Sequence, residues 1–355
     1  MALALTKGVS LKQKKDLVDK YRGLENLYDA IYSNQFHSRD QESCKVLQPQ
    51  LSAKAAEAEL RKVRVLRGWV VALGEAGYPA LLSEIPDPPL LLYGKGTLPP
   101  SNSHFLGFIG PREASQYGIR TAKWLAQDLA KEGLVLVSGL ARGIDAIAHQ
   151  SSVYAKTPTI AVLGCGLDQT YPKEHGFLRA KIEACGAVVT EFPVGEVPRK
   201  ENFPKRNRII AGLSKGILVM EAAEKSGVKI TVKYALSYDR DIYAVPGPID
   251  ASMSIYPNRL ISEGAKLVAT TGDILQEFGI VEKVKSRASK AEEALPNVAK
   301  SLLAYLDKDN GLSADDLAVK GNWSITDVMS LLTELELKGY VERQSDSRYV
   351  RIPAR

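Results

Sequence analysis

The chain is poor in the residues that build metal centres and disulfide frameworks. Its 355 residues include four histidines and three scattered cysteines, Cys44, Cys165 and Cys185. Neither a CxxC nor an HExxH motif occurs, so the sequence predicts no metal site. An odd number of unclustered cysteines is typical of a reducing compartment. We therefore expect a cytoplasmic protein without a bound metal.

Long apolar runs are lacking as well. No uninterrupted hydrophobic stretch approaches the roughly 20 residues of a membrane-spanning helix, and the lysine-bearing N-terminus has no signal-peptide core. We therefore expect no membrane association. The formal charge of +6 and the pI of about 9.0 are modest, so the composition permits a polyanionic partner without requiring one.

Standard nucleotide-binding fingerprints are missing too, because neither GxGxxG nor GxxxxGK(S/T) occurs. The chain instead uses one local pattern three times: an apolar run, a glycine-bearing loop and a helix-like stretch. The three segments are residues 104–112, 134–143 and 159–166. Each turn would leave backbone N–H groups unpaired at a helix start, where the helix dipole favours anions. Parallel strands deliver their loops to one edge of a sheet, so we expect a broad anion-binding surface there.

The first 283 residues divide into two regions. Residues 1–95 look helical and predict an N-terminal domain of the SAM or helix-hairpin-helix type. Residues 96–283 alternate strand-like and helical patterns, which predicts a Rossmann-like, doubly wound, mostly parallel α/β core. The expected strands cover residues 105–109, 134–137, 159–163, 187–190, 216–220, 242–245 and a possible seventh at 266–269. The expected helices cover residues 117–132, 143–155, 174–184 and 228–239.

A polar linker is predicted over residues 284–297 and a winged-helix domain over residues 298–355. Its expected helices cover residues 298–306, 313–319 and 324–338, and two short strands follow around Asp346-Ser347. The third helix carries three acids and one base, whereas a DNA-reading helix carries cations or amides. The acids are Asp327, Glu334 and Glu336, and the base is Lys338. We therefore expect this domain to contact protein rather than duplex DNA.

The most distinctive single segment is residues 203–212. Phe203 and Asn207 stand there among three cations, Lys205, Arg206 and Arg208. Single-stranded nucleic acid needs cations for its phosphates and an exposed ring for stacking. The same residues would also suit a solvated basic loop before a helix. From residue types alone, the two interpretations are equally favoured.

A carboxylate and an imidazole, Asp145 and His149, lie four residues apart and hence on one helix face. No nucleophile motif accompanies them, because Leu136 occupies the first glycine position of a GxSxG pattern. We therefore favour a structural, hydrogen-bonded pair over a catalytic one. Glu221, which follows the fifth strand, is expected either to pair with an arginine or to be a remnant of an enzymic function.

Taken in order, these segments resemble the DNA-processing protein A family (DprA, also called Smf) of bacterial natural transformation. The resemblance runs from about residue 77 to 270 without large gaps. It is carried by Gly110-Pro-Arg112, Ser138-Gly139, Gly143-Ile-Asp145, Tyr171-Pro172, Phe203-Pro204, residues 206–214, Ser226-Gly227 and residues 244–248.

The resemblance implies a core that binds single-stranded DNA, hands it to the recombinase RecA and forms a homodimer, without catalytic residues or a cofactor. By position, the DNA contacts that it implies are Arg112, Ser138, Gly139, Lys173, Phe203, Arg206, Asn207 and Arg208. The supporting phosphate-edge loops that it implies contain Gly110, Gly164, Gly166, Ser226 and Gly227.

Three departures from the family's usual pattern lie near these residues. Pro111 replaces a small residue, and proline removes a backbone donor there. Val228-Lys229 and Tyr256-Pro257 replace the residues that are typical after Ser226-Gly227 and before Asn258. We therefore expect a ligand edge that keeps its basic residues in a reshaped setting.

An enzyme is the alternative. Related Rossmann-like nucleotide phosphoribohydrolases carry a Pro-Gly-Gly-x-Gly-Thr signature followed by a glutamate. The nearest segment, residues 226–231, has neither the glycine run nor a downstream glutamate at a suitable spacing. The sequence therefore favours a non-catalytic DNA-binding protein over a nucleotide-processing hydrolase.

Overall fold

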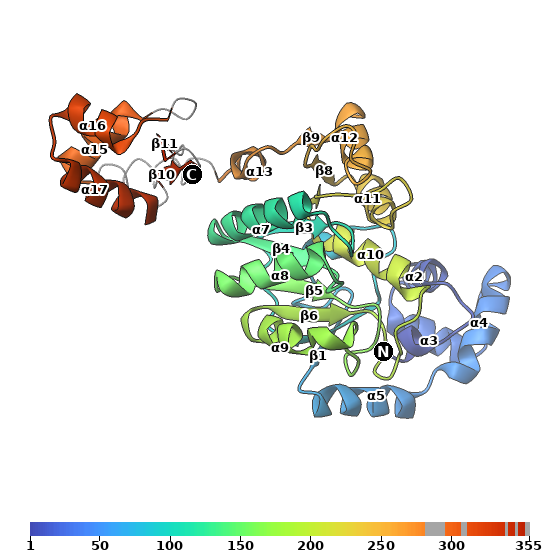
Figure 1. Cartoon of the computed structure of the whole chain (residues 1–355). Helices are drawn as coiled ribbons and strands as arrows, with labels where there is room; N and C mark the ends of the chain where they lie inside the picture. Colours follow the sequence, from blue (N-terminus) through green and yellow to red (C-terminus); the bar gives the residue numbers. More distant parts are fainter. Residues whose placement is uncertain (281–294, 307–310, 338–339, 345–346, 352–355) are drawn as a thin grey trace. The chain divides into compact units, whose positions relative to one another are not determined.

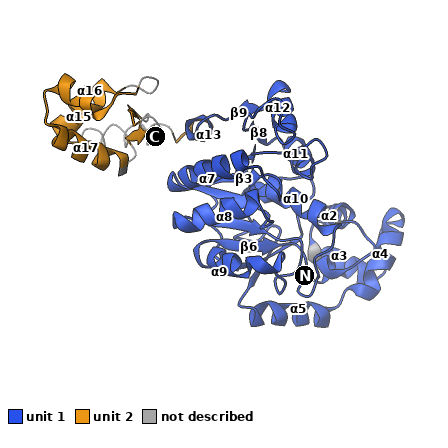
Figure 2. Cartoon of the chain, viewed as in Figure 1, with its two compact units in different colours: residues 1–274 blue, residues 275–355 orange. Residues whose placement is uncertain are grey.

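The computed structural model describes residues 1–280, 295–306, 311–337, 340–344 and 347–351 (Figure 1). The chain divides into two compact units, residues 1–274 and residues 275–355 (Figure 2). The first unit contains a mixed, mostly parallel sheet, and the second contains the C-terminal helices and a small hairpin.

One nine-stranded sheet organises the first unit, in the order β1-β2-β6-β5-β4-β3-β7-β8-β9. Its strands are β1 (Trp69–Ala72), β2 (Leu91–Gly96), β3 (His104–Ile109), β4 (Leu134–Ser138), β5 (Thr159–Val162), β6 (Ala187–Thr190), β7 (Gly216–Val219), β8 (Asp241–Ala244) and β9 (Lys266–Leu267). Strand β2 pairs antiparallel with both β1 and β6, and every other pairing is parallel. All seven predicted strands are present, so the predicted α/β class is confirmed.

Helices cover both faces of the sheet. On one face α7 (Gln116–Lys131), α8 (Ile144–Tyr154) and α9 (Gly176–Cys185) form one layer (Figure 1). On the other face lie α6 (Ala80–Ser83), α10 (Asn202–Leu213) and α11 (Val228–Ser237). Successive side chains of a strand point to opposite faces of the sheet, so they pack alternately against the two helical layers. In β5, for example, Ile160 and Val162 join the cluster that contains Ile209 of α10, whereas Ala161 joins the cluster of Ile182 in α9.

The direction of winding reverses beside β3. Strands β3, β4, β5 and β6 follow one another across the sheet, and β7 then returns to the other side of β3. In open α/β sheets, ligands bind outside the carboxyl ends of the strands near such a reversal. The fold therefore directs attention to the loops that follow β3, β4, β5 and β7. Beyond β8, the first unit continues with α12 (Ile255–Ser262), and α13 (Thr271–Glu277) crosses the division between the units.

The N-terminal helices end earlier than predicted. They are α1 (Ala2–Leu5), α2 (Leu11–Lys20), α3 (Leu24–Tyr32), α4 (Gln41–Leu47) and α5 (Ala53–Val65), with short 3-10 turns at Ser38–Asp40 and Gln48–Gln50. Leu17, Leu27, Ile31 and Leu47 belong to their shared core. The predicted boundary at residue 95 is wrong, because β1 and β2 belong to the sheet of the core. Trp69 reinforces this pairing, since its indole Nε1 donates a hydrogen bond to the carbonyl of Gly96 at 2.8 Å.

The second unit has the predicted winged-helix order: α15 (Asn297–Tyr305), α16 (Ala314–Gly321), α17 (Ile325–Leu337), β10 (Val341–Arg343) and β11 (Tyr349–Arg351). Ser313 caps α16 in a capping box with Asp316. Asp327, Glu334 and Glu336 of α17 are exposed, as the protein-contact interpretation requires. Residues 284–294 of the predicted linker lie outside the described residues, as do Lys338 and Asp346. Within the described part of the chain, no helix combines the length and hydrophobicity needed to cross a membrane.

Candidate nucleic-acid interface

The loops after β3, β4 and β5 meet at the carboxyl edge of the sheet. The amide of Ile144, just beyond the β4 loop, donates to the carbonyl of Pro111 in the β3 loop at 3.3 Å. Gly143 permits this approach, because it has a φ of +72° and an added Cβ would lie 2.4 Å from that carbonyl. The first turn of α10, after β6, packs against the same loops, since an added Cβ on Gly164 would lie 2.9 Å from Cδ1 of Phe203.

Two aromatic rings and one cation form an exposed platform at this edge. The rings of Tyr171 and Phe203 have centroids 5.3 Å apart and planes inclined by 39°. The guanidinium carbon of Arg112 lies 5.6 Å from the centroid of the Phe203 ring, within cation–π range. Arg112 is exposed, Tyr171 is 40% exposed and Phe203 is partly exposed. We call these three side chains the ring platform.

Tyr171 is the site residue that the sequence analysis missed. The Tyr171-Pro172 dipeptide was visible there, but nothing in the sequence shows that Tyr171 meets Phe203. Lys173 follows two residues later in a short 3-10 turn (Lys173–His175) and is exposed, as its predicted role requires. The neighbouring Glu174 pairs with the exposed Arg142, which joins this turn to the β4 loop. The structure therefore brings Arg112, Lys173 and Phe203 to one edge, as predicted.

Carboxylates of the chain itself occupy backbone donors of the first two glycine-bearing loops. Oδ2 of Asp145 accepts hydrogen bonds from the amides of Gly139 at 3.1 Å and Ala141 at 3.3 Å. Glu221 accepts from the amide of Ser115 at 3.0 Å and from its hydroxyl at 2.5 Å. These donors are therefore used inside the protein, and the prediction that the loops bind an external anion has no support from these amides.

In the third loop, after β5, an internal hydrogen bond also occupies a backbone amide. The amide of Gly166 donates to the carbonyl of Glu196 at 2.8 Å, and the amide of Gly195 donates to Oδ1 of Asp168 at 2.7 Å. Burial opposes the charge of Asp168, but this amide and the side chain of Gln169 lower its pKa. At neutral pH the Asp168 carboxylate is therefore ionised and holds the loop to residues 193–196.

Ser138 and Gly139 face the interior. Ser138 is completely buried, and its hydroxyl donates to the carbonyl of Phe108 at 2.7 Å. Gly139 is also buried, and an added Cβ would lie 2.2 Å from Nη1 of Arg206. Both residues are at the predicted edge, but neither presents a side chain or a free amide to a ligand.

Arg206 is buried as well, with an exposure of 5%. Its Nη1 donates to the carbonyls of Gly139 and Val162, each at 2.5 Å, and its Nε donates to Oδ1 of Asn207 at 3.1 Å. The predicted phosphate contact of Arg206 therefore has no support in this geometry. Asn207 is partly exposed, but its side-chain oxygen is committed to Arg206.

Arg208 faces another part of the protein. Five residues after Phe203, it lies about 140° around α10 from that ring. It is 5% exposed, pairs with Glu191, and donates through Nη1 to the carbonyl of Asp87 at 2.8 Å. Burial raises the pKa of Glu191, and the Arg208 guanidinium opposes this shift. Arg208 is therefore part of a buried ion pair and not of the ring platform.

Asp145 and His149 do not form the predicted pair with each other. Nδ1 of His149 lies 2.8 Å from Oγ1 of Thr159, whose hydroxyl donates to the carbonyl of Leu136 at 2.6 Å. Since that hydroxyl proton is already used, Nδ1 of His149 carries the proton of this hydrogen bond. Burial lowers the pKa of His149 to about 3, and the positive charge of Arg206 adds to this shift. Burial raises the pKa of Asp145, whereas Arg206 and the two bound amides favour its ionised form.

Two of the departures from the family pattern meet in space. Nζ of Lys229 lies 4.9 Å from the centroid of the Tyr256 ring and 2.8 Å from Oε1 of Glu224. Ser226 and Gly227 lie just before them: the Ser226 hydroxyl accepts from the amide of Val228 at 3.2 Å, and Gly227 is the N-cap residue of α11. The predicted role of this loop as a phosphate edge remains a prediction.

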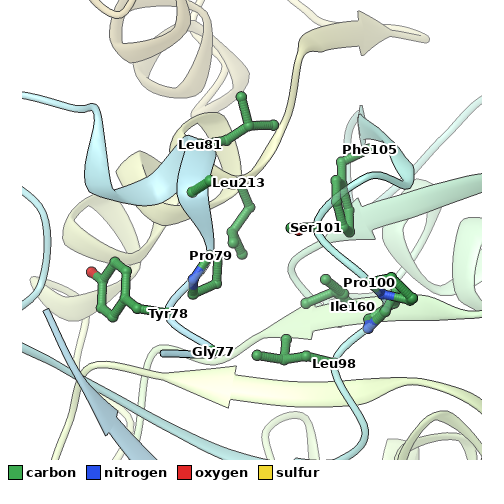
Figure 3. A pocket seen from close by; sticks show the side chains of 12 residues that line it. Gly77, Tyr78, Pro79, Leu81, Leu98, Pro100, Ser101, Phe105, Ile160 and Leu213 are labelled. Carbon is green, nitrogen blue, oxygen red and sulfur yellow. The ribbon is translucent and has the colours of Figure 1, made fainter. Parts of the chain in front are cut away.

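A separate apolar pocket lies toward the amino ends of the strands (Figure 3). Its volume is ≈ 340 Å³, and it is lined mainly by Tyr78, Leu81, Leu98, Phe105, Ile160 and Leu213. Phe105 and Ile160 lie near the starts of β3 and β5, whereas the ring platform lies beyond the strand ends. The pocket is therefore distinct from the candidate interface.

The fold and the edge together define a doubly wound α/β protein with a cationic, aromatic ligand edge and a winged helix in the same chain. The family model described as DNA recombination-mediator protein A matches residues 69–279, and the model of the DprA winged helix domain matches residues 286–347. The chain belongs to the DNA recombination-mediator protein A family, DprA or Smf.

Individual relatives agree with this assignment. Protein Smf of Escherichia coli is 39% identical, over 74% of this chain and 72% of the relative. DNA processing protein DprA of Streptococcus pneumoniae is 44% identical, over 57% of this chain and 71% of the relative. The X-ray structure of the Streptococcus pneumoniae protein superposes with a TM-score of 0.66 at 32% identity, over 78% of this chain and 95% of that one.

A second solved structure is DNA processing protein A of Helicobacter pylori, described for its single-stranded DNA binding mode. It superposes with a TM-score of 0.54 at 27% identity, over 62% of this chain and 97% of that one. The match to the family model of DNA recombination-mediator protein A starts at residue 69, which agrees with the observation that β1 belongs to the core.

The buried His149 predicts a pH dependence of stability. Its pKa of about 3 in the folded chain lies below the ordinary value of 6.5. Between these values the unfolded chain binds more protons, so stability falls as the pH falls. Only the pH range below the unfolded pKa of 6.5 contributes, which is about one unit of the interval from pH 7.5 to pH 5.5. Since one pKa unit corresponds to about 1.4 kcal/mol, lowering the pH over this interval should remove about 1.4 kcal/mol of stability through His149. Urea unfolding at both pH values measures the loss.

The control is His149→Asn, which keeps a donor near Nδ1 and cannot be protonated. This variant should lose about 1.4 kcal/mol less than the wild type over the same interval. Equal losses in the two proteins would show that His149 does not titrate between the folded and unfolded states as its burial implies.

Proposed function

We propose that this protein binds single-stranded DNA along the carboxyl edge of its sheet. The observation that carries the proposal is the ring platform, in which Tyr171 and Phe203 lie side by side and Arg112 covers Phe203. Exposed aromatic rings accept the faces of unpaired bases, and adjacent cations accept phosphates. The single-stranded DNA binding described for the Helicobacter pylori neighbour supports the same assignment.

The filled backbone donors favour a polymer over a free nucleotide. A nucleotide-binding loop holds phosphate through free amides at a helix start. Here Asp145 and Glu221 occupy amides of the β4 and β3 loops. Binding therefore depends on the side chains of Arg112 and Lys173 and on stacking, which gain strength when several nucleotides are bound together.

We propose that this role is non-catalytic. Asp145 and His149, the pair that invited a catalytic interpretation, are 8% and 0% exposed and make internal hydrogen bonds. Glu221 is 3% exposed and braces Ser115. No observation favours the alternative of a phosphoribohydrolase-like enzyme.

By its family, we further propose that the protein acts in the cytoplasm as a homodimer, loading RecA onto single-stranded DNA in transformation and recombination. The assignment to the recombination-mediator family supports this proposal. The three exposed acids of α17, Asp327, Glu334 and Glu336, support a protein-contact role for the winged helix.

Removing a ring of the platform should weaken binding to oligothymidylate. Each base–aromatic stack is worth about 1–3 kcal/mol, so Phe203→Ala and Tyr171→Ala should each raise the dissociation constant by about five- to 150-fold. Fluorescence anisotropy with a labelled oligothymidylate measures the change. Tyr154→Ala is the matched control, because Tyr154 is 77% exposed but ends α8 at the opposite edge. Equal affinities of the wild type and both platform variants would refute the stacking role.

Removing a cation should change the salt dependence. Each phosphate contact with a single strand contributes about −0.7 to the slope of log Kobs against log salt concentration. Arg112→Ala and Lys173→Ala should therefore each reduce the slope by about 0.7. Lys131→Ala at the end of α7 is the control and should leave the slope unchanged. A wild-type slope in both edge variants would remove these two residues from the interface.

RecA loading can be tested on single strands covered with single-strand binding protein. The full chain should shorten the lag of RecA's DNA-dependent ATP hydrolysis, and Phe203→Ala should do so less in proportion to its weaker DNA binding. Tyr154→Ala should behave as the wild type. If the wild type binds DNA but leaves the lag unchanged, RecA loading is refuted while DNA binding stands.

A further inference from the structure

We propose that Arg206 is a positioning residue, whose buried guanidinium fixes the place of Phe203 in the ring platform and contacts no phosphate. This inference rests on the proposed binding of single-stranded DNA. It reverses the role that the basic character of residues 205–208 predicts.

One nitrogen of Arg206 joins three parts of the edge. Arg206 lies three residues after Phe203, hence on the same side of α10 and one turn away. Its Nη1 donates to the carbonyl of Gly139, just after β4, and to the carbonyl of Val162, at the end of β5. The helix that carries Phe203 is thereby attached to the ends of two adjacent strands.

The attachment is close to the platform. Val162 precedes Gly164 by two residues, and Gly164 approaches the Phe203 ring so closely that an added Cβ would lie 2.9 Å from Cδ1. Holding the end of β5 against α10 therefore also sets the distance between this loop and the ring. The β5 loop continues to Tyr171, the second ring of the platform.

Gly139 is held from both sides. Its carbonyl accepts from Arg206, and its amide donates to the carboxylate of Asp145. Asp145 also lies near the buried guanidinium, and each of the two groups favours the charged form of the other. Only glycine fits here, because an added Cβ would lie 2.2 Å from Nη1 of Arg206.

These contacts leave little of Arg206 for a ligand. The residue is 5% exposed, and its Nη1 and Nε are committed to carbonyl oxygens and to Asn207. A phosphate contact through Nη1 would require breaking the attachment of α10 to both strands. The exposed cations Arg112 and Lys173 need no such rearrangement.

The test is Arg206→Lys in the full chain. Lysine keeps the charge, but its ammonium ends one bond short of Nη1 and it lacks the Nε donor, so it cannot rebuild the attachment. We expect binding to oligothymidylate to weaken by about tenfold, comparable to the loss of one base stack, with an unchanged salt slope. Arg240→Lys is the matched control: Arg240 is partly buried, binds the carbonyl of Leu81, and precedes β8 at the amino edge. The Arg240→Lys protein should bind oligothymidylate with the affinity of the wild type.

A double-mutant cycle separates positioning from a general structural effect. In a Phe203→Ala background, Arg206→Lys should change the affinity by less than about twofold, because the ring that it positions is gone. Gly139→Ala provides a second route, since its methyl group displaces the guanidinium without removing the charge. It should weaken binding to the same extent as Arg206→Lys and should also be nearly silent without Phe203.

The outcomes distinguish this role from the proposed function. If the wild type does not bind oligothymidylate, the proposed function falls and this role with it. If the wild type binds, near-wild-type affinity of Arg206→Lys and Gly139→Ala would overturn the positioning role alone. A tenfold loss that persists in the Phe203→Ala background would also overturn it. A soluble, folded Gly139→Ala protein decides the matter if Arg206→Lys does not fold.

Discussion

Two buried side chains, Asp145 and Arg206, hold Gly139 through its amide and its carbonyl, and the arrangement of the proposed DNA-binding edge depends on this contact. Arg206 extends the hold to Val162, so β4, β5 and α10 are joined at one point. Buried polar groups need filled hydrogen bonds, and leaving one of them unsatisfied typically costs about 1–3 kcal/mol. Asp145 meets this need for the amides of Gly139 and Ala141, and Arg206 meets it for the carbonyls of Gly139 and Val162.

Internal acceptors also fill backbone donors in the other two loops, so exposed side chains are the groups that remain for a ligand. Glu221 fills the donors of Ser115, and Asp168 ties the β5 loop to Gly195. A phosphate reaching this edge therefore meets side chains before it meets free amides. Rings and flexible cations tolerate any base sequence, which suits the proposed binding of single strands regardless of their sequence. In the function that we propose, side chains at this edge, rather than backbone amides, contact the polymer.

The sequence predicts the alternation of strands and helices in the core well, because each element has a local hydrophobic period. It does not place β1 and β2 in the core sheet, because the antiparallel pairings of β1 with β2 and of β2 with β6 are contacts of short segments, the latter over a long sequence separation. It also indicates the edge where Arg112, Lys173 and Phe203 lie, but it does not show that Ser138, Gly139, Arg206 and Arg208 are buried. Residue type does not reveal that the side chains of Ser138, Arg206 and Arg208 are buried. Nor does it reveal that Arg208 lies about 140° around α10 from Phe203. The meeting of Tyr171 with Phe203 likewise depends on tertiary packing.

A crystal structure of the full chain with a short oligothymidylate tests the central claim most directly. The account predicts a base against the rings of Tyr171 and Phe203 and phosphates at Arg112 and Lys173. It also predicts that Asp145 and Glu221 still hold the amides of Gly139 and Ser115. Phosphates bound to those amides, with Asp145 or Glu221 displaced and no base against Phe203, would contradict it.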